Sequence, residues 1–146
     1  MNWELPTPFV IDITVDKQAI DDYDHVNNTE YLRWIERISW EHSQHLGLGI
    51  DDYRQHDRAM VVHRHELDYL APAHIGERLQ LATWIVGCDG RLTLTRRFQL
   101  KRISDSCTLL RARTRFACIE LSSGRARRLP PAYVAIYGNA MIDETP

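Results

Sequence analysis

"DDYDHVNNTEYLRWIERISWEH", residues 21–42, joins an acidic loop to a strongly patterned helix. Apolar and aromatic residues recur there at spacings of three and four, which predicts one buried stripe on a helix. The stripe consists of Tyr31, Trp34, Ile35, Ile38, His42 and Leu46. Asn27 or Asn28 can cap the helix start, and Gly47 can end the helix in a left-handed conformation. We therefore predict a central, buried helix.

Strand patterns surround this helix. Residues 8–15 have the β-branched content of a strand, and after residue 58 alternation replaces helical spacing. Four long strands are predicted at 59–70, 77–88, 91–103 and 108–121, with Asp89-Gly90 as a hairpin turn and a short closing helix at 132–138. One helix covers only one face of such a sheet, so the other face must meet water or a second subunit. A homodimer or homotetramer is expected.

Composition narrows the class of protein. The 146 residues, 44% hydrophobic and 26% charged, are typical of a single globular domain, expected to span residues 1–146. No apolar run is long enough to cross a membrane and no secretory signal is visible, so we expect a cytoplasmic protein. Three cysteines without a CxxC motif make a disulfide framework or a zinc site improbable. We expect no metal, no cofactor, no nucleic acid and no membrane partner.

The acidic loop has a structural and a chemical interpretation. A helix start presents unpaired backbone N–H groups and a partial positive charge, which stabilise an oxyanion. A carboxylate just upstream could act on a carbonyl whose oxygen points at those amides, as hydrolysis of an activated ester requires. Aspartates before a helix are, however, more often caps that favour the helix dipole. The spacing alone leaves both interpretations open.

The same loop resembles a known family. Hotdog-fold acyl-CoA thioesterases of the 4-hydroxybenzoyl-CoA thioesterase-like type have a loop of the form D-x-D-x-x-G-H-V-N-N-x-x-Y before a long helix, and this chain has "AIDDYDHVNNTEY". Residues 69–91 resemble the family's P-A-x-x-G-[DE] segment and next strand, and residues 111–130 its last strand and turn. The resemblance, over roughly residues 8 to 135, implies an α+β hotdog fold, with an antiparallel sheet wrapped around one long central helix.

The resemblance also implies roles for individual residues. Asp21 would be the catalytic carboxylate, either a general base for water or a nucleophile. The backbone N–H of Asn28 would polarise the thioester carbonyl, and His25 and Asn27 would shape the loop or help to place water. No cofactor is implied. The implied activity is hydrolysis of an acyl-CoA thioester to a free acid and coenzyme A.

Two positions depart from the family pattern. Ala19 stands where the family has its first acid, and Asp24 replaces the glycine before the histidine. Asp24 removes a residue that adopts positive φ freely, although aspartate tolerates that conformation better than most residues. Asp22 and Asp24 remain rivals of Asp21 for the catalytic role.

Further residues are candidates for substrate binding. Tyr31 and Trp34 would line the acyl pocket. Residues 1–70 carry 6 basic and 14 acidic residues, and residues 71–146 carry 12 and 6, so the halves are about −8 and +6. Either the halves face each other, or arginines bind the nucleotide phosphates of coenzyme A. These arginines are Arg96, which interrupts an apolar strand face, and Arg111, Arg113, Arg115, Arg125, Arg127 and Arg128.

Other interpretations stay open. The pairs His42 and His45, and His63 and His65, have spacings that a metal could use, but no third ligand is suitably placed. Within the fold, the substrate could be a thioester of acyl carrier protein, or the reaction could be that of a hydratase. From a different class, the chain could be a non-catalytic acyl-binding dimer. The acyl group itself is not indicated.

Overall fold

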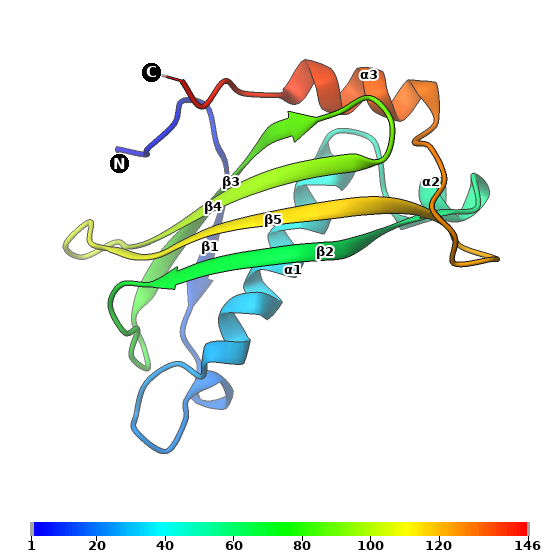
Figure 1. Ribbon diagram of the computed structural model, residues 1–146. Coiled ribbons are helices and arrows are strands. Elements are labelled where there is room, and N and C mark those ends of the chain that lie inside the picture. Colours follow the sequence, from blue (N-terminus) through cyan, green and yellow to red (C-terminus); the bar gives the residue numbers. More distant parts are fainter. Residues whose placement is uncertain (1, 146) are drawn as a thin grey trace.

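A computed structural model describes residues 2–145 of the chain. Five antiparallel strands form one twisted sheet in the order β1-β3-β4-β5-β2 (Figure 1). All five predicted strands are therefore confirmed, close to their expected bounds. The strands are β1 (Phe9–Thr14), β2 (Arg58–Tyr69), β3 (Arg78–Cys88), β4 (Thr93–Arg102) and β5 (Thr108–Glu120).

Helix α1 (Asn28–His45) lies across one face of the sheet (Figure 1). Its start is capped by Asn27, whose side chain accepts a hydrogen bond from the Thr29 amide at 3.1 Å. Its end is marked by Gly47, which has a φ of +94°, the left-handed conformation predicted for it. The predicted apolar stripe is buried: Ile35 and Ile38 are almost fully covered in the core between α1 and the sheet.

One detail of the predicted fold needs correction. A single long central helix is not seen, because α1 has only 18 residues and shares the helical part of the fold with other helices. Two further helices, α2 (Ile50–Gln55) and α3 (Pro131–Ala140), pack at one end of the sheet. Tyr53 of α2 and Tyr137 of α3 are buried in a second apolar cluster there. A short 3₁₀ turn, Lys17–Ala19, lies between β1 and α1.

The outer face of the sheet is partly covered by the two ends of the chain. Trp3 packs edge-on against Trp84 with ring centroids 6.4 Å apart. Arg97 forms ion pairs with Glu4 at 2.7 Å and with Glu144 at 3.3 Å, so one guanidinium holds segments from both ends. Water or a second subunit was expected on this face, and the chain supplies part of the cover itself.

Strand β2 forms one edge of the sheet and is largely exposed. Val61 and Val62 are 39% and 50% exposed, and the pairing with β5 shifts register between Val62 and Arg64. An exposed edge with apolar side chains can pair with another strand. Among residues 2–145, no helix combines the length and apolar character needed to cross a membrane.

Candidate active site

The acidic loop is closed by a narrow neck of backbone hydrogen bonds. Ile20 and Val26 pair as an antiparallel bridge, and the Asn27 amide donates to the Ala19 carbonyl at 2.7 Å. The Val26 amide donates to Ala73 at 3.0 Å, which ties the neck to the segment before β3. Because facing residues in such a bridge lie about 4.5–5.5 Å apart, Asp21 emerges beside the start of α1.

Asp21 is held in position by the loop itself. Its Oδ1 accepts hydrogen bonds from the amides of Tyr23 at 2.8 Å and His25 at 3.2 Å, and the side chain is half-buried. Within residues 2–145, no donor contacts Oδ2. One oxygen therefore organises the loop and the other is available to a ligand. The rival acids Asp22 and Asp24 are exposed.

The two departures from the family pattern have clear places in the loop. Asp24 has a φ of 62°, so it adopts the left-handed conformation that a glycine would adopt there at less cost. Ala19 is 3% exposed, and its carbonyl accepts the Asn27 amide. The backbone of residue 19 therefore helps to close the loop. An acidic side chain at this buried position would lose its hydration, which is costly.

The start of α1 presents the expected donors. Asn27 satisfies the Thr29 amide, whereas no acceptor among residues 2–145 contacts the Asn28 amide. An unpaired N–H at a helix start, with the positive end of the helix dipole behind it, suits an oxyanion. The Tyr69 hydroxyl donates to the Asn28 carbonyl at 3.3 Å and supports this turn from β2.

Aromatic side chains pack beneath the helix start. The Tyr31 ring lies edge-on to Trp34 and to Tyr69, with centroids 5.4 Å apart in both pairs. Tyr31 and Trp34 are 3% and 8% exposed and belong to the main core. Burial raises the pKa of Tyr31, so this phenol stays neutral. Both residues support the site from within the core and do not line the cavity that lies beside α1.

His25 joins the loop to the segment before β3. Its ring lies edge-on to His74 with centroids 5.2 Å apart. The His74 ring contacts Glu77 at 3.2 Å, and Glu77 forms an ion pair with Arg102 at 2.5 Å. His74 and Tyr69 were not singled out in the sequence, although both belong to the stretch that resembles the family.

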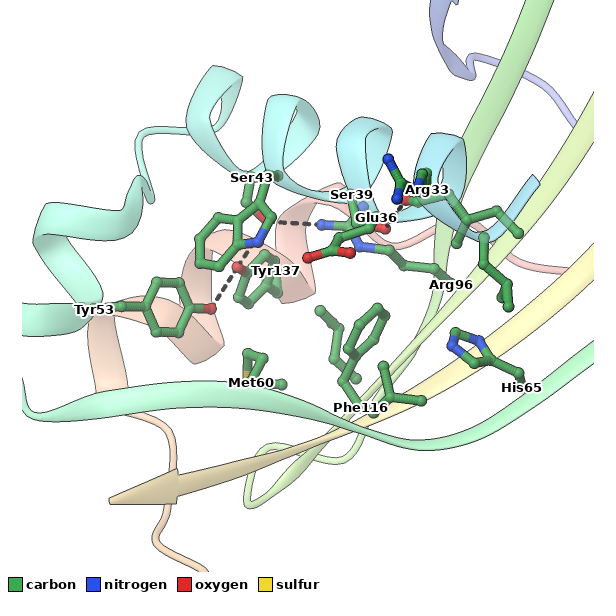
Figure 2. Close-up of a pocket in the computed structure, with 15 residues that line it drawn as sticks. Arg33, Glu36, Ser39, Ser43, Tyr53, Met60, His65, Arg96, Phe116 and Tyr137 are labelled. Carbon is green, nitrogen blue, oxygen red and sulfur yellow. Dashed lines mark hydrogen bonds between the residues drawn. The ribbon is translucent and has the colours of Figure 1, made fainter. Parts of the chain in front are cut away.

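Arg96 lies well away from the loop. It is 1% exposed beneath the C-terminal half of α1, where its guanidinium donates to His42 Nδ1 at 2.7 Å. It also donates to Ser43 Oγ at 2.8 Å (Figure 2). It therefore does not share a surface with the other arginines. Arg111 and Arg113 pair with the terminal acids Glu4 and Glu144, which favours a structural role for them.

The paired histidines have structural partners. His42 stacks on Phe9 at 4.9 Å, and His65 Nδ1 lies 2.7 Å from Thr114 Oγ1. The residues described by the structure contain no group of three or more His, Cys, Asp or Glu side chains that could hold a metal. Cys88, Cys107 and Cys118 are free thiols.

Comparison with known proteins gives a consistent assignment. The family model of the thioesterase-like superfamily matches residues 15–136. No match is found among curated proteins. Three solved structures are similar at TM-scores of 0.81 to 0.84, and their low identities establish the fold alone.

Two of these structures are thioesterases. The Synechocystis protein Slr0204, a 1,4-dihydroxy-2-naphthoyl-CoA thioesterase, is 19% identical, with 91% of this chain and 97% of that chain covered and a TM-score of 0.81. The DHNA-CoA thioesterase of Staphylococcus aureus is 16% identical, covers 90% and 89%, and has a TM-score of 0.84. SAV2348 of S. aureus, a hypothetical protein in complex with CoA, is 16% identical, covers 97% and 90%, and has a TM-score of 0.82.

The structural matches confirm the predicted hotdog fold. The family match confirms the predicted enzyme class, a thioester hydrolase. The family model spans the acidic loop, α1 and all of β2 to β5. The chain belongs to the thioesterase-like superfamily.

Proposed function

We propose that the protein hydrolyses an acyl-CoA thioester to a free acid and coenzyme A. The observation that supports the proposal is the closure of the loop: Ile20, which precedes Asp21, pairs with Val26, two residues before Asn28, and the Asn28 amide has no acceptor among residues 2–145. The thioester carbonyl would point its oxygen at this amide, where the helix dipole stabilises the negative charge that develops on attack.

Asp21 acts as the attacking group or as its activator. The free Oδ2 either takes a proton from a water molecule that attacks the thioester carbon, or attacks that carbon directly. Collapse of the tetrahedral intermediate breaks the carbon–sulfur bond and releases the thiol of coenzyme A. His25, within the loop, and Asn27, which caps α1, hold the Asp21 carboxylate and the Asn28 amide in position.

Coenzyme A is the favoured carrier because the structurally similar SAV2348 is described in complex with CoA. On this chain, Arg115, Arg125 and Arg128 are exposed and form no ion pair with any acid among residues 2–145, so they are the candidates for phosphate contacts. Arginine forks suit phosphate groups. An acyl carrier protein, expected to be acidic, would use the same basic surface.

The test is thiol release from a panel of short, long and aromatic acyl-CoAs by the wild type and by Asp21→Asn. Asparagine keeps an oxygen that can accept the Tyr23 and His25 amides but cannot act as a base. We expect kcat to fall by about 10²–10⁴-fold with the fold intact. Asp22→Asn is the matched control, because Asp22 lies in the same loop and is exposed.

Equal turnover by wild type and Asp21→Asn would refute the role of Asp21. Turnover of the carrier-protein thioester in place of the CoA thioester would redirect the proposal to that substrate. Binding of acyl-CoA without turnover of either thioester would instead identify a non-catalytic acyl-binding protein.

A further inference from the structure

A cavity of about 300 Å³ lies beside α1, between the helix and the sheet (Figure 2). It begins at Leu32, one helical turn beyond Asn28, and follows the helix to Ser43. At about 30 Å³ for a water-sized group, it holds roughly ten non-hydrogen atoms. Its apolar lining comes from α1 and from three strands: Leu32, Ile35, Trp40, Met60, Leu94 and Phe116.

The inner end of this cavity is polar. Arg96 reaches it from β4, among alternating residues of which Leu94 and Phe98 are buried. The Ser43 hydroxyl accepts from Arg96 and lies 3.0 Å from the Tyr137 hydroxyl, which lies 2.6 Å from the Tyr53 hydroxyl. Figure 2 shows these groups converging from α1, α2, α3 and β4.

The charge of Arg96 has no counterion in this cluster. Burial lowers the pKa of Arg96 to about 10, which leaves the guanidinium protonated at neutral pH. Burial and the Arg96 charge lower the pKa of His42 to about 3, and burial raises the pKa of Tyr53, so both partners are neutral. Within residues 2–145, no carboxylate lies within 4.0 Å of Arg96.

A buried charge without an opposite charge is costly, and an anion placed against it offsets that cost. Glu36 and Arg33 line the open side of the cavity, but both are exposed and carry opposite charges. Arg96 is therefore the group that distinguishes the inner end. An apolar channel that ends at a guanidinium suits a chain that is apolar along its length and anionic at its tip.

We propose that this cavity binds the acyl group of the substrate and that Arg96 binds a carboxylate at the far end of that group. The substrate class is then a monothioester of a dicarboxylic acid. This inference rests on the proposed function, since it names the substrate of the same reaction. Arg96 acts in binding and takes no part in bond breaking.

The test compares substrates of equal length that differ at the tip: adipoyl- and suberoyl-CoA against hexanoyl- and octanoyl-CoA. For at least one pair, kcat/KM should favour the carboxylate by about ten- to hundredfold, as a charge-assisted hydrogen bond provides. Arg96→Met should abolish this preference, and Arg96→Lys should keep part of it. The ratio within one variant does not depend on how much of that variant is folded.

Arg78→Met, which removes an exposed arginine from β3 with no role in the proposed binding of coenzyme A, is the matched control and should keep the wild-type ratio. A wild-type ratio near one in every pair would overturn the inference while the proposed hydrolysis stands. So would a preference that survives Arg96→Met. A preference for the carboxylate that appears only in Glu36→Gln would mean that Glu36 is the anion that neutralises Arg96 in the wild type, and this result would also overturn the inference.

A second readout separates the two proposals. If no thioester is hydrolysed, the proposed function fails, and binding of free suberate against free octanoate is measured by thermal denaturation. Stabilisation by suberate that disappears in Arg96→Met would support the carboxylate site. Equal effects of the two acids, or of suberate on wild type and variant, would overturn it.

Discussion

Asp24 carries the largest local backbone cost in the acidic loop, because its φ of 62° is unfavourable for a residue with a Cβ. Asp24→Gly should raise the free energy of unfolding by about 0.5–1 kcal/mol, less the entropy that glycine adds to the unfolded chain. Asp24→Ala should lower it by about 1 kcal/mol, since alanine lacks the local hydrogen bonding that helps aspartate in this region. Urea denaturation measures both; equal stability of the Gly and Ala variants would contradict this account.

His42 makes stability depend on pH. Its pKa is about 3 in the folded protein and 6.5 in the unfolded chain, because burial and Arg96 disfavour the charged imidazole. As pH falls from about 6.5 towards 3, the unfolded chain binds a proton that the folded protein does not, so the free energy of unfolding falls. The slope contributed by one proton is about 1.4 kcal/mol per pH unit.

Urea denaturation between these pH values tests the contribution of His42. His42→Asn should reduce the slope by up to one proton, whereas Ser43→Ala, which removes the other Arg96 partner and keeps the imidazole, should not. An unchanged slope in His42→Asn would show that another group dominates acid sensitivity.

At the scale of single residues, the sequence singled out individual candidates but did not predict which side chains they contact. Arg96 stood out because it interrupts an apolar alternation, and the motif singled out Asp21 and Asn28. The contacts of Arg96 with His42 and Ser43 depend on how α1 crosses β4, and no local pattern encodes that crossing.

At the scale of the element, the start of α1 depends on one side chain. Asn27 accepts hydrogen bonds from the amide and the hydroxyl of Thr29 at 3.1 and 3.0 Å. Asn27→Ala should lower the free energy of unfolding by about 1 kcal/mol and also reduce kcat, because the Asn28 amide sits in the same turn. Asn27→Asp keeps an acceptor and should preserve stability. If the two variants are equally stable by thermal denaturation, the cap is not what defines the helix start.

The individual elements were largely predictable, whereas their arrangement was not. Periodicity indicated α1 and the four strands β2 to β5, β-branched content indicated β1, and Gly47 indicated where α1 ends. The pairing of β2 with β5 and of β1 with β3 joins segments far apart in the chain, which alternation alone does not specify. Helix α2, with six residues, was too short to give a helical period.

For the whole molecule, the ends of the chain contribute to stability through ion pairs. Hydrogen bonds and charge from Arg113 and Arg97 outweigh burial and lower the pKa of Glu144. Glu144→Gln should therefore lower the free energy of unfolding by about 0.5–1 kcal/mol at low salt and by less at high salt. Asp143→Asn removes a neighbouring charge that contacts no arginine and is the control. Equal losses in both variants would mean that net charge, and not the ion pairs, is responsible.

Self-association remains a prediction, now with a specific surface. The exposed edge of β2 should pair with a second copy, giving a mass by light scattering of at least twice the chain's 17.1 kDa. A charge at a half-exposed valine of this edge, Val61→Lys, should shift the protein towards the monomer. A wild-type monomer at all concentrations would contradict the expected oligomer.

The shared contact of Glu4 and Glu144 with Arg97 also bears on how the connectivity of this chain can be changed. Both ends lie on the same side of the sheet (Figure 1), so a short glycine-rich bridge could join them in a circular permutant. New ends could be opened in the exposed turn around Gly124, between β5 and α3, without cutting a strand or helix. Such a rearrangement would keep the loop neck, the helix start and Arg96 in place while moving attachment points for labels to the opposite end of the sheet.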